Sequence, residues 1–140
     1  MLLTAPTGIA ACNIGSVTVH SAFCLPVEHK ISATYVPLRA EKLKQFRIKF
    51  KDVAYVIIDE ISMLSCHNFD FVHKRLCEIK DTSSDPTVLF GGLSLIVVGD
   101  LFQLKPVHGC YIFDTRKPES YLWHRVSILT TNHRQAGDKT

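Results

Sequence analysis

The stretch VIIDEISML, from Val56 to Leu64, decides the fold class of this chain. An apolar run that starts at Val53 leads directly into two adjacent carboxylates, Asp59 and Glu60. A continuous apolar run of this length is typical of a strand covered on both faces, as in a parallel sheet. Two charged groups do not belong in such a core, so the pattern predicts that both lie at the end of a buried strand and serve a ligand there.

A second apolar run with the same ending follows later in the chain. It is LSLIVVGD, from Leu93 to Asp100. Between the two runs, Ser65 is placed to cap a helix that reaches to Lys80. Strands that alternate with helices indicate βαβ units, so we predict an α/β fold with a mostly parallel sheet. The expected buried stripe of the helix consists of Phe69, Val72, Leu76 and Ile79.

Shorter elements complete the expected fold. The chain opens with a short apolar run that turns at Pro6, Thr7 and Gly8. We predict a helix over 9–14, and an amphipathic helix over 38–51 with Leu43, Phe46 and Phe50 on its apolar side. A short helix is expected around Glu119–His124 and a last strand near Val126–Leu129. Segment 38–51 is strongly basic, which fits a solvated helix face or, alternatively, a surface close to phosphates.

The composition favours a globular, soluble and intracellular chain. The 140 residues, 46% of them hydrophobic and 21% charged, fit one compact domain or a large part of one. No apolar run is long enough to span a bilayer and no signal peptide opens the sequence, so we expect no membrane partner. The formal net charge of +3 permits a polyanionic partner without requiring one.

The five cysteines give no sign of a disulfide framework or of a zinc site. They are odd in number and contain no CxxC pair, which suits a reducing compartment. The tightest group that resembles a metal site is Cys66, His67, His73 and Cys77. Its spacing fits no standard zinc motif, so we favour a helix with a buried stripe over a zinc centre.

The acids at the strand ends point to a divalent cation. In open α/β sheets, ligands bind outside the carboxyl ends of the strands, and two strands deliver Asp59, Glu60 and Asp100 to that edge. Like charges this close repel one another unless a cation or a shifted pKa relieves them. Oxygen ligands next to phosphates favour Mg²⁺. One acid would hold the hydrated metal and the other would accept a proton from an attacking water, although helix caps and structural ion pairs also produce such a pattern.

Polar segments after the other elements fit a phosphate site. Gln103 follows Asp100 by three residues and is able to sense a phosphate oxygen or orient a water, although an ordinary loop glutamine looks the same. Arg134, after the expected last strand, carries a guanidinium that binds phosphate in a fork, although most such arginines are surface residues. TAPTGIAA and VTVHSAF resemble turns and helix starts, which expose backbone N–H groups or merely cap helices.

Taken in order, these segments resemble the Pif-one family of superfamily 1 DNA helicases, including its Helitron-type relatives. The matching text is LTAPTGIAACNIGSVTVHSAF, VIIDEISML, FGGLSLIVVGDLFQLKPV and LTTNHRQ, which covers nearly the whole chain. The resemblance implies a RecA-like motor domain that hydrolyses ATP with Mg²⁺ while it moves 5′ to 3′ along single-stranded DNA and unwinds duplex DNA. It also implies a context of DNA repair, recombination and telomere maintenance, and therefore a nuclear location.

The resemblance assigns roles residue by residue. Asp59 is similar to the acid that holds Mg²⁺, and Glu60 to the general base. Gln103 is similar to the glutamine that links the γ-phosphate to the DNA-binding motifs, and Arg134 to the arginine that stabilises the transferring phosphoryl group. The family's DNA-binding motifs fall on Thr7, Gly8, His20 and Ser21. Phe90, Gly91 and Gly92 match a loop with a conformational role.

Departures from the family pattern indicate a fragment. The phosphate-binding GxxxxGK[ST] loop does not occur in these residues, and Lys105 stands where the family usually has proline. We expect residues 1–140 to be part of a first RecA-like domain that lacks its P-loop strand, with 24–51 as a loop and helix insertion between motor motifs. The fragment alone should be inactive, because it needs the P-loop segment and a second RecA-like domain in cis.

Two alternative functions remain open from the sequence. The chain could be a non-catalytic remnant of a mobile-element helicase that binds single-stranded DNA through Thr7, His20 and the basic segment 39–51, which the missing P-loop favours. It could also be a metal nuclease that uses Asp59, Glu60 and Asp100. The sequence offers no further acid or histidine at a matching strand end, which argues against the nuclease.

Overall fold

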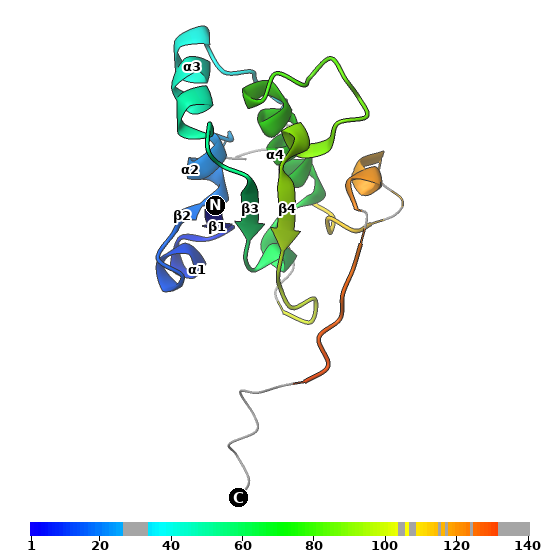
Figure 1. Ribbon diagram of the computed structural model, residues 1–140. Coiled ribbons are helices and arrows are strands. Elements are labelled where there is room, and N and C mark those ends of the chain that lie inside the picture. The colour runs from blue at the N-terminus through cyan, green and yellow to red at the C-terminus, as the bar shows by residue number, and fades with distance from the viewer. Residues whose placement is uncertain are drawn as a thin grey trace, which may run out of the picture.

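The computed structural model describes residues 1–26, 34–103, 106, 109–114, 116, 118–123 and 125–131. In these ranges, four parallel strands form a sheet in the order β2-β1-β3-β4 (Figure 1). The two apolar runs that end in acids are neighbouring strands, which confirms the expected α/β fold with a parallel sheet. The strands are β1 (Leu2–Ala5), β2 (Val17–Thr18), β3 (Tyr55–Ile58) and β4 (Ser94–Val97).

The longest helix begins and ends where the sequence predicts. Ser65 is its N-cap and accepts a hydrogen bond from the backbone N–H of Asn68 at 3.2 Å, and Lys80 is its C-cap. Such a serine satisfies an N–H group that the first turn leaves without an intrahelical partner. The α-helices of the described residues are α1 (Gly8–Asn13), α2 (Val19–Phe23), α3 (Ala40–Lys49) and α4 (Cys66–Ile79), and the short 3-10 helices are η1 (Ile61–Met63), η2 (Leu89–Gly92) and η3 (Pro118–Leu122).

One face of the sheet is buried against helices. Val56 and Ile58 of β3 are fully buried in a cluster that includes Val72 and Leu76 of α4 and Phe23 of α2. Figure 1 shows α4 behind β3 and β4. Burial of each such side chain stabilises the fold by about 1.5–3 kcal/mol, so this interface is the main source of stability.

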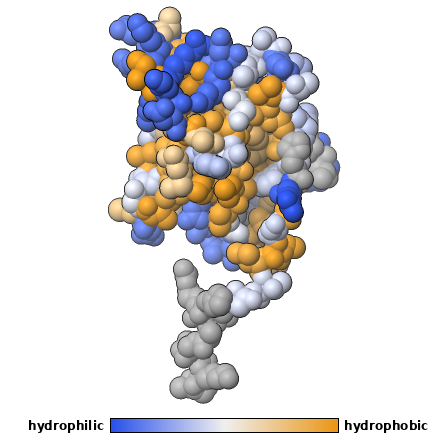
Figure 2. All heavy atoms as spheres, in the orientation of Figure 1, coloured by the Kyte–Doolittle hydropathy of each residue, from blue (hydrophilic) through white to orange (hydrophobic). Residues whose placement is uncertain are grey.

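The opposite face of β3 and β4 carries no helix in the described residues, and nothing lies in front of it in Figure 1. Tyr55 is 53% exposed, Ile96 48% and Val98 47%. Because side chains alternate along a strand, these residues share one side of the sheet. Figure 2 shows the hydrophobic surface that gathers over the middle of the molecule on this side. We call this surface the open face; parallel sheets are normally covered on both faces.

The turn before β4 packs closely against α4. Phe90, Gly91 and Gly92 have positive φ angles of 51°, 65° and 76°. An added Cβ on Gly91 would lie 2.5 Å from the carbonyl oxygen of Leu76, so only glycine fits there. The buried ring of Phe90 lies 5.4 Å from that of Phe69. The FGG sequence therefore has a packing role, while its expected conformational role stays a prediction.

A buried network around Arg75 fixes the segment that leads into α3. The Arg75 guanidinium is 2.5 Å from a Glu78 carboxylate oxygen and donates to the carbonyl of Phe23 at 3.0 Å. Glu78 also accepts hydrogen bonds from the Tyr35 hydroxyl at 2.6 Å and from the Leu38 N–H at 2.7 Å. Burial and the bond to Glu78 raise the pKa of Tyr35 well above its ordinary value. Leu38 lies just before the N-cap of α3, so the start of this helix has a fixed position.

Two expected elements near the end of the chain differ in the structure. The last strand, predicted near Val126–Leu129, is wrong: residues 125–131 form no strand. In the described part of the chain no strand lies beside this segment to accept its hydrogen bonds, so its apolar side chains stay exposed. The short helix expected around Glu119–His124 is the 3-10 helix η3, which begins at Pro118.

None of the described helices has the length and apolar character that a membrane span requires.

Candidate functional site

The two acid-bearing turns are in contact at the carboxyl edge of the sheet. β3 and β4 end side by side, and beyond them the N–H of Ile61 donates to the carbonyl of Val98 at 3.0 Å. Gly99 lies against this turn, since an added Cβ would be 2.9 Å from the Ile61 nitrogen. Asp59 and Asp100 each lie next to this contact, at the edge where open α/β sheets bind ligands. The close approach at Gly99 is a feature that the sequence interpretation missed, although a glycine between a strand and an acid was its signal.

The first turn holds Glu60 in an unusual backbone conformation. Its φ and ψ are 51° and 42°, in the left-handed region that residues other than glycine seldom adopt. The N–H of Glu60 donates to the Asp59 carboxylate Oδ1 at 2.9 Å, and the N–H of Asp59 donates to the Thr4 carbonyl at 2.9 Å. A left-handed residue costs about 1–2 kcal/mol, and such strain is concentrated at functional sites. The turn thus fixes the backbone of both adjacent acids.

The second turn joins Asp100 to Gln103. The Phe102 N–H donates to Asp100 Oδ1 at 2.9 Å, and the Gln103 N–H donates to the Asp100 carbonyl at 3.2 Å. The Gln103 side-chain amide Nε2 lies 3.5 Å from Asp100 Oδ2. Both residues are exposed, and Phe102 is fully exposed between them. The role expected for Gln103, to sense a phosphate oxygen or orient a water, stays a prediction.

The charges at this edge suit a hydrated divalent cation. Within the described residues, no cationic side chain lies within ion-pairing distance of Asp59, Glu60 or Asp100, which counts against structural ion pairs there. The hydroxyl of Ser62, in the same turn as Glu60, is buried without a hydrogen-bond partner. No group of three or more His, Cys, Asp or Glu side chains in the described residues is arranged as a metal site. The donors therefore fit Mg²⁺ held by one or two carboxylates and by water, and not a fully protein-ligated ion.

The residues expected along the DNA strand lie at the starts of two short helices. Thr7 is the N-cap of α1 and its hydroxyl accepts from the Ala10 N–H at 3.2 Å. An added Cβ on Gly8 would meet nothing within 4 Å, so internal packing does not require this glycine. His20 lies in the first turn of α2, and the Ser21 N–H donates to the Thr18 hydroxyl at 3.2 Å. Capping thus explains Thr7 and Thr18, and Gly8 is the residue whose identity the fold leaves unexplained.

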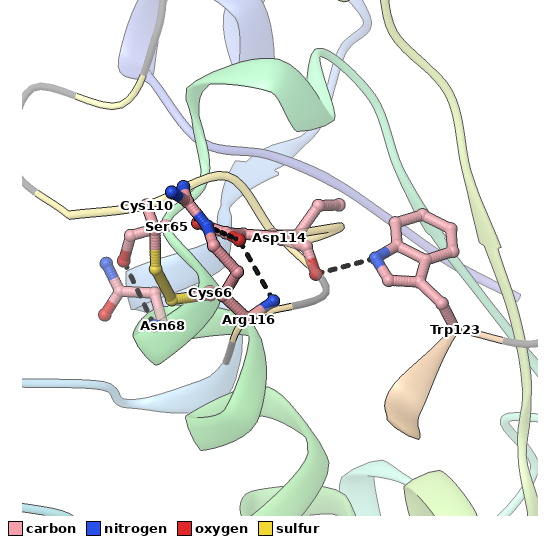
Figure 3. The surroundings of a disulfide bond; sticks show 8 residues. Ser65, Cys66, Asn68, Cys110, Asp114, Arg116 and Trp123 are labelled. Atoms are coloured by element: carbon pink, nitrogen blue, oxygen red, sulfur yellow. Dashed lines mark hydrogen bonds and ion pairs between the residues drawn. A yellow bond between two sulfur atoms is a disulfide. The ribbon is translucent and has the colours of Figure 1, made fainter. Parts of the chain in front are cut away.

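A disulfide joins the two segments that carry the acids. Cys66, the first residue of α4, is bonded to Cys110, 44 residues further along the chain (Figure 3). The N–H of Cys66 donates to the Cys110 carbonyl at 3.0 Å, and Ser65 and Tyr111 form an isolated antiparallel bridge. The argument against disulfides from the sequence is therefore wrong for this pair. Local cysteine spacing carries no information on a contact made by residues so far apart.

The cysteine and histidine group lies on a helix with the expected buried stripe. His73 and Cys77 face each other on α4, with His73 Nδ1 3.7 Å from the Cys77 sulfur. The same Nδ1 accepts the N–H of Phe90 at 3.0 Å, and Cys66 is used by the disulfide. Burial lowers the pKa of His73, which favours the neutral ring that accepts this bond. The expected stripe of Phe69, Val72, Leu76 and Ile79 is buried throughout.

Some predicted residues lie outside the described part of the chain. Arg134 and Lys105 are among them, so the structure gives neither residue a position. Trp123 is the last aromatic side chain of the described residues, and its Nε1–H donates to the Ile112 carbonyl at 2.8 Å (Figure 3). This bond ties η3 to the segment that follows the disulfide.

Residues 1–140 match a family model described as PIF1-like helicase. The chain is 33% identical over 148 aligned residues to the ATP-dependent DNA helicase PIF1 of Saccharomyces cerevisiae (strain YJM789), which covers 97% of this chain and 16% of that protein. Among solved structures it is similar to Bacteroides Pif1 in complex with ADP-AlF4 and to the same helicase bound to ssDNA. Each has a TM-score of 0.60 and 34% sequence identity, over 76% of this chain and 24% of theirs. The chain therefore spans a quarter or less of the length of these relatives.

Proposed function

The chain belongs to the PIF1-like helicase family, and on this basis we propose that it is part of an ATP-driven motor that moves 5′ to 3′ on DNA and unwinds it. The main support is the contact between two acid-bearing turns at the carboxyl edge of a parallel sheet. The Bacteroides relative solved in complex with ADP-AlF4 supports a nucleotide as the ligand. The family match supports the helicase and not the nuclease alternative.

The two adjacent acids divide the chemistry between them. Asp59 uses Oδ1 for the turn, which leaves its second oxygen to hold a hydrated Mg²⁺. When bound, Mg²⁺ supplies positive charge that stabilises the phosphate oxygens during transfer. Glu60, whose backbone is held in the left-handed conformation, accepts the proton of the attacking water. The hydrogen bond to Asp59 Oδ1 supports this division, because it gives the two acids different surroundings.

Two further residues complete the proposed phosphate site. Gln103, on the neighbouring turn, senses the γ-phosphate and passes its presence to the DNA-binding segments. Arg134 stabilises the charge of the transferring phosphoryl group through its guanidinium, which is the side chain best suited to phosphate. DNA contacts are made by Thr7, Gly8, His20 and Ser21 at the starts of α1 and α2. The relative bound to ssDNA supports DNA as the partner.

Activity requires parts that these residues do not contain. The sequence has no GxxxxGK[ST] loop, whose lysine and backbone N–H groups grip the β- and γ-phosphates in motors of this type. We propose that a P-loop segment and a second RecA-like domain act in cis with residues 1–140, which form part of the first such domain, and that residues 24–51 are an insertion between its motor motifs. Action on chromosomal DNA, in its repair and recombination and at telomeres, would take place in the nucleus.

The experiment places this chain in a complete motor. Residues 1–131 replace the matching segment of Bacteroides Pif1, and ATP turnover is measured with and without single-stranded DNA. We expect DNA-stimulated turnover, and a loss of about 10²–10⁴-fold in Glu60→Gln, the range that general base catalysis contributes. Fluorescent nucleotide should still bind to Glu60→Gln. Asp52→Asn, an exposed acid away from the site, is the matched control.

Normal turnover by Glu60→Gln would exclude Glu60 as the base. A chimera that binds DNA but never hydrolyses ATP would favour the second candidate, a non-catalytic DNA-binding remnant. The observation in favour of that candidate is the basic segment 39–51. In that case Asp59→Asn and Glu60→Gln would leave DNA affinity unchanged.

A further inference from the structure

The basic helix α3 has a charge that the fold itself does not use. Six cations lie between residues 39 and 51, against one acid inside the helix, Glu41. All six are exposed, and Figure 2 shows the hydrophilic surface that they form at the upper left, over α3 in Figure 1. We call this surface the α3 basic face. It consists of Arg39, Lys42, Lys44, Arg47, Lys49 and Lys51.

Most of these cations lack an acidic partner. In the part of the chain that the structure describes, only Arg47 forms an ion pair, with Asp81 at 2.9 Å, and Lys49 lies 5.7 Å above the Phe46 ring. Lys42 and Lys44 have no carboxylate within ion-pairing distance there. A surface that serves solubility alone would mix both signs of charge.

The cations at the start of α3 oppose helix formation, whereas Arg47 and Lys49 lie in the last turn, where the helix dipole favours positive charge. Arg39 is the N-cap and Lys42 lies in the first turn, where the helix dipole disfavours positive charge. Arg39 makes no side-chain capping bond. An external anion near the start of α3 would relieve this repulsion.

The backbone of α3 holds the cations on a fixed support. Phe46 stacks on Phe50 with ring centroids 6.0 Å apart, and Phe50 lies 6.0 Å from Phe23 of α2. Lys80 of α4 donates to the Phe50 carbonyl at 2.8 Å. The bond from the Leu38 N–H to Glu78 fixes the other end of the helix. Little ordering of the backbone is therefore needed when a ligand binds.

The α3 basic face is separate from the proposed nucleotide edge. α3 leads into the amino end of β3, whereas Asp59 follows its carboxyl end. At about 3.3 Å per residue, four strand residues place these ends about 13 Å apart. α2 connects the two regions, because it begins at Val19, directly after the carboxyl end of β2, and ends at Phe23, whose ring lies 6.0 Å from that of Phe50.

We propose that the α3 basic face binds the phosphate backbone of DNA as a second contact, apart from the one assigned to Thr7 and His20. This rests on the proposed function, which makes DNA the partner. Lys42 and Lys49 are seven residues apart, which is about 10 Å along the helix axis and matches about three phosphates of one duplex strand. Protein–protein interfaces are depleted in lysine, so a lysine-rich face favours phosphates over an acidic protein.

The test measures DNA binding by the 140-residue chain without nucleotide. Fluorescence anisotropy follows a labelled 20-mer of oligo-dT and a labelled 20-base-pair duplex from 50 to 300 mM salt. Lys42→Gln/Lys44→Gln is compared with Arg116→Gln/Arg125→Gln, which removes the same charge at exposed positions outside α3. Thermal melts show that both variants fold.

We expect the Lys42→Gln/Lys44→Gln variant to lose affinity about tenfold or more at 50 mM salt, with a salt slope shallower by about 1.4 on oligo-dT or 1.8 on the duplex. The oligonucleotide for which the variant loses more affinity identifies the form of DNA, single-stranded or duplex, that α3 contacts. The control pair should change both quantities much less.

Three outcomes would overturn this assignment. They are a wild-type chain that binds neither oligonucleotide, an equal loss in the control pair, and a 20-residue polyglutamate that displaces DNA as well as unlabelled oligo-dT does. His20→Ala separates the two proposals. If His20→Ala binds DNA normally while Lys42→Gln/Lys44→Gln does not, the DNA contact assigned to His20 is wrong and the contact proposed for the α3 basic face is supported. Since no ATP is present, none of these outcomes affects the Glu60 turnover test.

Discussion

The two faces of the sheet differ in what they require from the rest of the protein. On the covered face, Ile58 of β3 is completely buried against helices. On the open face, Ile96 of the neighbouring strand is 48% exposed, although it is the same type of residue. The sequence treats both alike, since each belongs to a continuous apolar run. Apolar runs of this kind are typical of a sheet that is buried on both faces. The described residues bury only one face of this sheet.

The covered face also explains where the site residues are held. α4 buries β3 from behind, and its N-terminal end is bonded through Cys66 to the segment after Gln103. Asp59 and Glu60 therefore follow a strand that is packed against α4. The open face adds apolar surface without adding contacts, and a surface of this kind marks an interaction site.

The largest expected effect compares the same substitution on the two faces. Ile58→Ala should lower the free energy of unfolding by about 2–5 kcal/mol, because it leaves a cavity in a packed core. Ile96→Ala should cost less than about 1 kcal/mol, since half of that side chain is already in water. Urea unfolding followed by circular dichroism measures both values at low protein concentration.

Equal losses in the two variants would break the comparison. They would mean that the open face is covered in solution by a second copy of the chain. Repeating the Ile96→Ala measurement over a tenfold range of concentration distinguishes the cases, because self-association makes the unfolding midpoint depend on concentration.

A smaller effect is expected at two glycines with nearly the same backbone. Gly91 (φ 65°) lies against α4 on the covered side, and Gly15 (φ 62°) has open space around it. Both alanine variants suffer the same left-handed strain, but Gly91→Ala also forces a Cβ to within 2.5 Å of the Leu76 carbonyl oxygen. Gly91→Ala should therefore be less stable than Gly15→Ala by about 1–3 kcal/mol, measured by thermal unfolding. Equal stabilities would show that the turn before β4 moves away from α4 at little cost.

Sequence patterns sufficed wherever local chemistry decides the structure. The apolar runs before Asp59 and Asp100 identified β3 and β4, and the order of strands and helices gave the parallel sheet. Ser65 marked the start of α4 because a serine hydroxyl satisfies an N–H of the first turn. The spacing of apolar residues fixed the buried side of α4 for the same reason, since helix geometry is independent of the rest of the chain.

Features that depend on distant partners could not be predicted. The segment Val126–Leu129 has the composition of a strand, but a strand also needs a neighbour, which the described residues do not provide. The bond between Cys66 and Cys110 depends on how two distant segments meet. The left-handed backbone of Glu60 is set by the packing of the turn, and nothing in the residue itself favours it.

The smallest expected effect is a pH dependence of stability that arises from His73 on α4, the helix that covers the buried face of the sheet. The pKa of His73 lies below its ordinary value of 6.5, chiefly because burial disfavours the charged ring. The unfolded chain therefore binds more protons, so this contribution to stability is present above about pH 6.5 and is lost as the pH falls through the lower pKa of the folded state. Protonation also removes the acceptor of the Phe90 N–H. The change should be modest because the ring is only half-buried and solvent screens its charge.

Unfolding midpoints in urea at pH 7.5 and 5.5 should differ less in His73→Gln than in the wild type. An unchanged difference would assign the pH dependence to other groups and would place His73 outside the cooperative core.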